Sequence, residues 1–171
     1  MHHMPRHKRE LGPPEANIPL DVCTHFDPQA SEPLAIWLQL DSSFRGAARQ
    51  LERLLSAERL SSTSFTVLAH LPREPDGIPA MQLSQITGNS PSSVSELLKR
   101  MEREGLCSRR PDPRDGRGAM IHISAAGSET LLRAAKIYAD WLLSHLGQLT
   151  NTELRTLQRA AIILGNLHAI D

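Results

Sequence analysis

The segment from Ser90 to Gly105 contains the signals for both ends of one helix. Ser90 is a preferred N-cap residue, Pro91 suits the first helical position, and Gly105 is a common residue just after a helix. Between these ends the apolar residues recur at i, i+3, i+4 and i+7, a spacing that places them on one face. The sequence therefore predicts an amphipathic helix whose buried side consists of Val94, Leu97, Leu98 and Met101.

The opposite face of this predicted helix is polar, and its residue types change along its length. Hydroxyl side chains lie near the N-terminus and cations follow toward the C-terminus. This order is typical of a helix that presents its first turn to DNA bases and its later turns to phosphates. A solvated surface helix has a similar composition, so this segment alone leaves both interpretations open. The polar residues are Ser92, Ser93, Ser95, Lys99, Arg100 and Arg103.

The flanking segments favour DNA binding. Residues 81–89 read as a short helix followed by a tight turn, so two helices meet across a few residues, as in a helix-turn-helix. Downstream, residues 106–110 and 119–124 are predicted strands, and the proline- and glycine-containing loop 111–118 joins them. We therefore expect a mainly α fold with a small β-hairpin wing, that is, a winged helix-turn-helix. Ile78 is expected to add an edge residue to the wing sheet.

These segments resemble the MarR family of bacterial transcription regulators. The resemblance covers about residues 34–167 and rests on Leu83 to Ser95, on Leu97 to Arg110, and on the wing with the following Met120 to Gly127. The wing is the most specific part, because Asp112-Pro-Arg114 is followed shortly by Arg117, as in the family. The resemblance implies a dimeric, sequence-specific DNA-binding regulator, usually a repressor, that acts on a pseudo-palindromic operator and responds to a small molecule.

The expected DNA contacts divide by side-chain chemistry. The serines can donate to or accept from base edges, and Lys99, Arg100 and Arg103 are expected to contact phosphates. A guanine base is the alternative contact for Arg100. By resemblance, Arg114 and Arg117 reach the minor groove, while Asp112 and Asp115 pair with arginines and shape the wing. The alternative for these four loop residues is a self-neutralising surface turn. The DNA-binding residues expected from the sequence are Ser92, Ser93, Ser95, Lys99, Arg100, Arg103, Arg114 and Arg117.

The rest of the chain predicts long helices outside the winged-helix core. We expect a flexible arm at 1–32, an N-terminal dimerisation helix at 33–60, the DNA-binding lobe at 61–124 and C-terminal dimerisation helices at 125–171. The first helix should begin at Ser31 and Pro33 and end near Glu58, and Ser61 or Ser62 should cap the next one. A long helix is expected over Ala125 to Leu146, and Thr150 to Glu153 forms a capping box for the last.

The apolar faces of these helices exceed what a winged-helix core can cover, so we expect a second copy of the chain as the partner. In the resembled family the terminal helices intertwine two subunits. The expected inner residues are Leu34, Trp37, Leu38, Phe44, Ala48, Leu51 and Leu55 in the first helix, and Leu131, Leu132, Ala135, Ala139, Leu142, Leu143 and Leu146 in the long helix. The residues expected at the dimer interface are Leu157, Ala161, Leu164 and Leu167.

Composition excludes several other classes. Lys plus Arg and Asp plus Glu both number 19, so the net charge is zero, which argues against indiscriminate binding to polyanions. The two cysteines make no disulfide framework, and no apolar signal core or membrane span is present, so a cytoplasmic location is expected. The eight histidines and the cysteines show no metal-ligand spacing, and no catalytic motif is found, so we expect neither an enzyme nor a metal or other cofactor.

The sequence does not identify a ligand. The resemblance places small-molecule pockets where the dimerisation helices meet the DNA-binding lobe, near Trp37, Phe65, His70 or Trp141. The alternatives are a winged-helix protein-interaction module that binds no DNA, which the zero net charge favours, and a metal- or redox-sensing regulator of the same fold.

Overall fold

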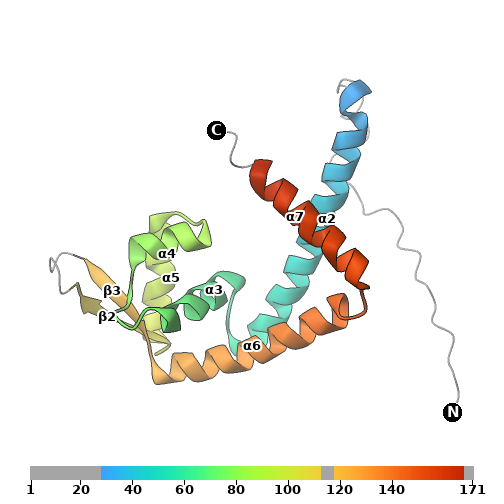
Figure 1. Cartoon of the computed structure of the whole chain (residues 1–171). Coiled ribbons are helices and arrows are strands. Elements are labelled where there is room, and N and C mark those ends of the chain that lie inside the picture. The colour runs from blue at the N-terminus through green and yellow to red at the C-terminus, as the bar shows by residue number, and fades with distance from the viewer. Residues whose placement is uncertain (1–27, 113–117, 168–171) are drawn as a thin grey trace, which may run out of the picture. The chain divides into compact units, whose positions relative to one another are not determined.

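The computed structural model describes residues 28–112 and 118–167 (Figure 1). The chain divides into two compact units, residues 1–50 and 51–171, and each is described by itself. The expected arm over residues 1–32 lies largely outside the described residues, as do Arg114, Asp115 and Arg117 in the wing.

The first unit consists of the short 3-10 helix η1 (Pro28–Ala30) and most of helix α2 (Ser31–Leu55). Helix α2 begins at Ser31 and is followed by the 3-10 helix η2 (Ser56–Glu58), so the expected bounds are confirmed. In the single chain Trp37 is 53% exposed and Phe44 is 61% exposed, so their burial against a second copy stays a prediction. A single α-helix carries its side chains on its outside, so they are buried only where another element covers them.

The helix-turn-helix lies in the second unit. Helix α3 (Ser62–His70) begins at a capping box formed by Ser61 and Ser64, and the 3-10 helix η3 (Leu71–Arg73) follows it. Helix α4 (Ala80–Thr87) ends at Gly88, whose φ of 66° is a conformation that glycine adopts easily. Helix α5 (Pro91–Arg103) has Ser90 as its N-cap and proline at its start, as predicted.

The wing is a three-stranded antiparallel sheet with the order β1-β3-β2. Strands β2 (Cys107–Pro111) and β3 (Ala119–Ile123) form the hairpin, and β1 (Ile78–Pro79) pairs with the outer side of β3. In the register, Ile121 of β3 lies opposite Arg109 of β2 and Ile78 of β1. The predicted hairpin and the edge residue Ile78 are confirmed.

Two further helices complete the second unit. Helix α6 (Ala125–Leu146) is capped by Ser124, whose Oγ accepts a hydrogen bond from the Gly127 N–H at 2.9 Å. Helix α7 (Asn151–Leu167) begins at the predicted capping box: Thr150 N–H donates to Glu153 Oε2 at 2.7 Å, and Glu153 N–H donates to Thr150 Oγ1 at 3.3 Å. The hydrogen bonds from Thr150 lower the pKa of Glu153.

The core of the second unit gathers side chains from α3, α4, α5, β3 and α6. Burial of this apolar surface supplies the main stabilisation of the lobe. The fully buried side chains include the predicted inner residues of α5, and Leu97 packs against the core as a partly buried residue. The core residues with the least exposure are Leu55, Val67, Leu68, Ile78, Leu83, Val94, Leu98, Met101, Ile121 and Ala134.

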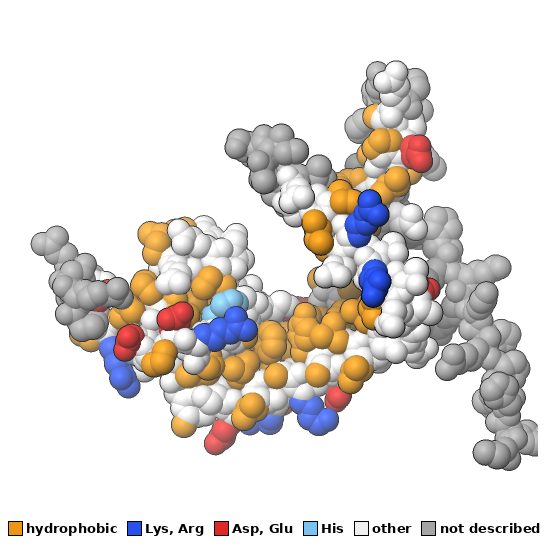
Figure 2. Space-filling view, in the orientation of Figure 1, with side chains coloured by type: hydrophobic (Ala, Val, Ile, Leu, Met, Phe, Trp, Pro, Cys, Tyr) orange, Lys and Arg blue, Asp and Glu red, His pale blue; other side chains and the backbone are white. Residues whose placement is uncertain are grey.

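The lobe covers only part of the expected inner face of α6, where Leu131 packs against the core. Leu132 is 71% exposed and Leu143 is 68% exposed, whereas Gly127, Thr130 and Ala134 are buried. The small residues recur at spacings of three and four, and they allow the helix backbone to approach the lobe closely. Apolar side chains consequently remain on the surface along α6 (Figure 2). In the described part of the chain, no helix is long and apolar enough to cross a membrane.

Candidate nucleic-acid interface

The first turn of α5 carries a cluster of three serine hydroxyls. Ser90 Oγ lies 3.0 Å from Ser92 Oγ and 2.9 Å from Ser93 Oγ, and it accepts a hydrogen bond from the Ser93 N–H at 3.3 Å. All three side chains are exposed. Ser92 and Ser93, which are both expected to contact bases, therefore lie close together. Their hydroxyls are hydrogen-bonded to Ser90 and must break these bonds to reach a base edge.

The later turns of α5 present the three expected cations. Lys99, Arg100 and Arg103 are exposed, on the face opposite the buried stripe. Arg103 Nε donates to the Lys99 main-chain oxygen at 3.4 Å, which directs this side chain back along the helix. Ser95 is partly buried, so the last of the expected serines is less accessible than the first two. The structure thus places hydroxyls and cations on one exposed helix face in the predicted order.

Arg109 of β2 is a further residue of this region, and no role was predicted for it. Its Nη2 donates to the Ser95 main-chain oxygen at 3.3 Å, and its Nε lies 3.3 Å from Glu102 Oε2 as an ion pair. That Nε is buried, and its alignment with Glu102 is not that of a hydrogen bond. Arg109 therefore connects the wing to two turns of α5. Its partners lie seven and fourteen residues away, so no local pattern could reveal the contact.

The described part of the wing loop ends at Asp112 and resumes at Gly118. Asp112 N–H donates to the Gly118 main-chain oxygen at 2.9 Å, which extends the hairpin by one hydrogen bond. Asp112 is partly buried, and its expected role in shaping the loop stays a prediction. The roles of Arg114, Asp115 and Arg117 remain predictions, because these residues lie outside the described ranges.

Two of the four expected ligand-pocket residues belong to one aromatic row. Phe65 stacks on Tyr138 with centroids 5.4 Å apart, and Tyr138 meets Trp141 edge to face at 6.2 Å. Tyr138 was not predicted, although it lies three residues before Trp141 on α6. His70 instead bonds through Nδ1 to the Thr66 main-chain oxygen at 2.8 Å. Trp37 belongs to the other unit.

The described residues contain neither a reactive thiol nor a cluster of metal ligands. Cys107 is buried, and this burial, assisted by the nearby Glu102 carboxylate, raises its pKa to about 11. A thiol with such a pKa is protonated at neutral pH and is a poor nucleophile and metal ligand. Within residues 28–112 and 118–167, no three His, Cys, Asp or Glu side chains gather in an arrangement that could hold a metal ion.

Comparison with known proteins gives matches over this same region. The sequence model of the MarR family matches residues 60–118, from the start of α3 to the wing. A helix-turn-helix transcriptional regulator of Mycobacterium tuberculosis is 28% identical over 74 residues, which are 43% of this chain and 52% of the relative. An uncharacterised regulator of Mycobacterium leprae is 27% identical over the same shares. The chain spans about half the length of the curated relatives it matches.

Solved structures share the fold over most of the chain. A MarR family transcriptional regulator from Streptomyces coelicolor, in complex with DNA, gives a TM-score of 0.73 at 21% identity and covers 79% of this chain and 86% of its own. The transcriptional regulator BldR from Sulfolobus solfataricus has a TM-score of 0.68 and 22% sequence identity, and the match covers 82% of this chain and 99% of BldR. CouR from Rhodococcus jostii, solved with p-coumaroyl-CoA bound, has a TM-score of 0.65 and 19% sequence identity, and the match covers 74% of this chain and 88% of CouR.

The sequence match and the structural likeness agree on the same elements. The match over residues 60–118 includes α3, α4, α5 and the first hairpin strand β2, and it ends just before β3. Helices α4 and α5 with the hairpin are the parts that define a winged helix-turn-helix. The described geometry, with a capped α5 beside a three-stranded wing sheet, has the same architecture as the solved regulators. Residues 60–118 therefore match the MarR family, and most of the chain shares its fold with a MarR family regulator of known structure.

Proposed function

We propose that this protein is a dimeric, sequence-specific DNA-binding transcriptional regulator, a repressor whose affinity for its operator changes when a small molecule binds. The observation that supports DNA binding best is the exposed face of α5. Hydroxyls at its N-terminus and cations in its C-terminal half lie opposite the apolar stripe, of which Val94, Leu98 and Met101 are buried. The hairpin wing packs beside this helix. This arrangement suits a helix in the major groove. The related regulator from Streptomyces coelicolor was solved with DNA.

A dimer is proposed because of the apolar side chains that the second unit leaves exposed. On α7, Leu157 is 50% exposed, Ile162 is 59% exposed and Ile163 is 55% exposed. Ala161 is exposed and Leu164 is partly buried, whereas the side chain of Leu167 is outside the described set. Such a concentration of apolar surface is typical of an interface. Two copies related by a two-fold axis would present two α5 helices to a pseudo-palindromic site.

A small-molecule effector is proposed from the aromatic row. Phe65, Tyr138 and Trp141 present aromatic surface from α3 and α6, and Trp141 Nε1 is buried with no hydrogen-bond partner among the described residues. An aromatic ligand with a hydrogen-bond acceptor would suit these groups. The likeness to CouR, solved with p-coumaroyl-CoA, supports a search among aromatic acids and their thioesters.

The function is tested by selecting DNA fragments that the purified protein retains and then measuring affinity by fluorescence anisotropy over a range of salt concentrations. We expect a shared pseudo-palindromic sequence and a linear fall of log affinity with log salt, because phosphate contacts release counterions. Arg100→Ala should weaken binding by about tenfold, and Arg155→Ala, which removes an exposed arginine from α7, serves as its matched control. Fragments without a common sequence, bound without salt dependence, would favour the protein-interaction module instead.

A further inference from the structure

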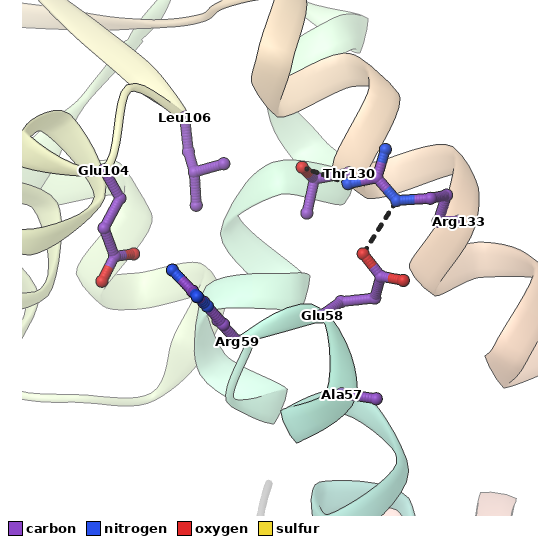
Figure 3. Close-up of a pocket in the computed structure, with 7 residues that line it drawn as sticks. All are labelled: Ala57, Glu58, Arg59, Glu104, Leu106, Thr130 and Arg133. Carbon is purple, nitrogen blue, oxygen red and sulfur yellow. Dashed lines mark hydrogen bonds and ion pairs between the residues drawn. The ribbon is translucent and has the colours of Figure 1, made fainter.

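A cavity of about 310 Å³ lies between η2, the end of α5 and the first half of α6 (Figure 3). Its wall contains two arginines, two glutamates, the hydroxyl of Thr130 and the apolar side chain of Leu106. This set is separate from the aromatic row, which shares no residue with it. The cavity thus has a balanced charge and an apolar wall, and its chemistry differs from that of the aromatic surface.

Two of the four charged side chains, Arg133 and Glu58, already form an ion pair with each other. Arg133 Nε donates to Glu58 Oε2 at 2.8 Å, and Arg133 Nη2 donates to Thr130 Oγ1 at 3.1 Å. These bonds fix the Arg133 side chain along one side of the cavity and neutralise Glu58. The matched pair therefore leaves the other arginine and glutamate as the groups available to a ligand.

Arg59 and Glu104 extend toward one another from opposite sides of the cavity (Figure 3). Within the described residues, neither side chain forms a hydrogen bond or an ion pair, and both are exposed. A direct ion pair between two exposed side chains contributes little free energy, because water screens it and both side chains lose rotamer freedom. A ligand that supplies both opposite charges can therefore insert between them at small cost.

The backbone at Arg59 adds an independent observation. Its φ is 56°, the one positive value outside glycine in the described part of the chain. Arg59 N–H donates to the Ser56 oxygen at 3.0 Å and Leu60 N–H donates to the Leu55 oxygen at 3.1 Å, so Arg59 occupies the helix-ending position that usually holds glycine. An arginine held in this unfavourable conformation, with its guanidinium directed into a cavity, points to a functional use of the side chain.

We propose that this cavity binds a small zwitterion of the α-amino acid class. The planar Arg59 guanidinium matches a carboxylate with two parallel hydrogen bonds, and the Glu104 carboxylate accepts hydrogen bonds from the ammonium group. Leu106, 8% exposed, supplies an apolar contact for a side chain. The two glutamates disfavour a simple anion and the two arginines disfavour a simple cation, so the site selects a molecule that has both charges.

The location gives such a ligand access to the DNA-binding helix. Glu104 is the C-cap of α5 and follows Arg103 directly, while Arg59 belongs to the turn after η2. A ligand held by both residues ties the end of α5 to that turn. The bound amino acid then changes the position of α5 and hence the affinity for DNA, an effect that rests on the proposed function.

The site is tested by titrating the purified full-length protein with the twenty L-α-amino acids, using amide chemical shifts as the readout and no DNA. Propionate and propylamine are the single-charge controls. We expect at least one amino acid to saturate the shifts of Arg59 and Glu104 below about 10 mM, and Arg59→Gln and Glu104→Gln each to weaken it about tenfold or more. Arg73→Gln, which removes an exposed arginine outside the cavity, should leave the affinity unchanged.

Several results would overturn the site: no saturation by any amino acid, equal binding of a single-charge control, or unchanged affinity in both cavity variants. The effector role has a separate test, in which the selected operator is titrated with and without the saturating amino acid. A shift in DNA affinity that Arg59→Gln abolishes supports that role, and an unchanged affinity overturns it. A protein that binds no DNA overturns the proposed function, while the direct titration still decides the site.

Discussion

The Nη2 atom of Arg109 on strand β2 donates a hydrogen bond to the main-chain oxygen of Ser95 on helix α5, at 3.3 Å. With the ion pair to Glu102, this contact holds the wing strand against the helix that carries the expected DNA contacts. The Arg109 side chain is only 29% exposed, so its role is to position the helix and not to meet a phosphate.

Replacing Arg109 with Ala should lower DNA affinity by about tenfold, because α5 and the wing lose their common orientation, and should cost about 1 kcal/mol of stability. The slope of log affinity against log salt should stay the same, since no phosphate contact is removed. Fluorescence anisotropy measures the DNA affinity, and urea unfolding measures the stability. Arg73→Ala, an exposed arginine of the same unit, is the control. A reduced salt slope in Arg109→Ala would show that Arg109 contacts the backbone of DNA.

Gly127→Ala should destabilise the second unit by about 3 kcal/mol, at the upper end of overpacking costs. A Cβ atom at this position would lie 2.0 Å from the main-chain oxygen of Leu106, and a backbone atom cannot move aside as a flexible side chain can. Gly46→Ala is the matched control, because no atom lies within 4 Å of its added Cβ. The control should be neutral or stabilising by up to about 1 kcal/mol, since alanine favours a helix over glycine. Equal unfolding midpoints would mean that α6 does not approach Leu106 so closely.

Cys107 should resist thiol reagents in the folded protein. In a Cys23→Ser background, which we expect to leave DNA binding unaltered, labelling at pH 8 should be about a hundredfold slower without urea than with it, because a pKa near 11 leaves far less thiolate. The raised pKa also predicts that stability is complete below the ordinary value of 9.0 and declines as pH rises toward about 11. Fast labelling of the native protein would contradict both expectations.

Helix bounds were predictable because local residues determine them. Ser90 with Pro91, Ser61, and Thr150 with Glu153 each act within four residues, and the structure uses every one of these caps. The hairpin followed from the prolines and glycines of its loop. The buried stripe of α5 was also predictable, since one helix face packs against one core.

Long-range relationships were not predictable in the same way. The face of α6 that packs on the lobe depends on a backbone approach between Gly127 and Leu106, which the leucine pattern does not reveal. The contact from Arg109 to Ser95 and the cavity between Arg59 and Glu104 join residues far apart in the chain. Arg59 in a left-handed conformation has no sequence signal, because such a position normally selects glycine.

In the wing, replacing Arg114 or Arg117 with Ala should weaken operator binding and reduce the salt slope by about 1, because each variant removes one cation from the DNA surface. The fold should stay intact, because the sequence predicts both side chains on a loop outside the core. Circular dichroism and anisotropy on the same samples separate the two effects. Unchanged affinity of both variants at moderate salt would remove the wing from the mechanism and leave the self-neutralising surface turn as its description.

The last prediction concerns the dimer. If Leu157 and Leu164 face a second copy, replacing both with Glu places uncompensated charge in an apolar interface, at a cost of several kcal/mol, and the dimer should dissociate. A single subunit contacts only one half-site, so operator affinity should fall by orders of magnitude although Ser92 to Arg103 are unchanged. Sedimentation and anisotropy are measured on one preparation, with Gln158→Glu as the control for added charge on α7. A double variant that remains dimeric and binds DNA normally would exclude α7 from the interface, and the apolar surface of α6 would then be the next candidate.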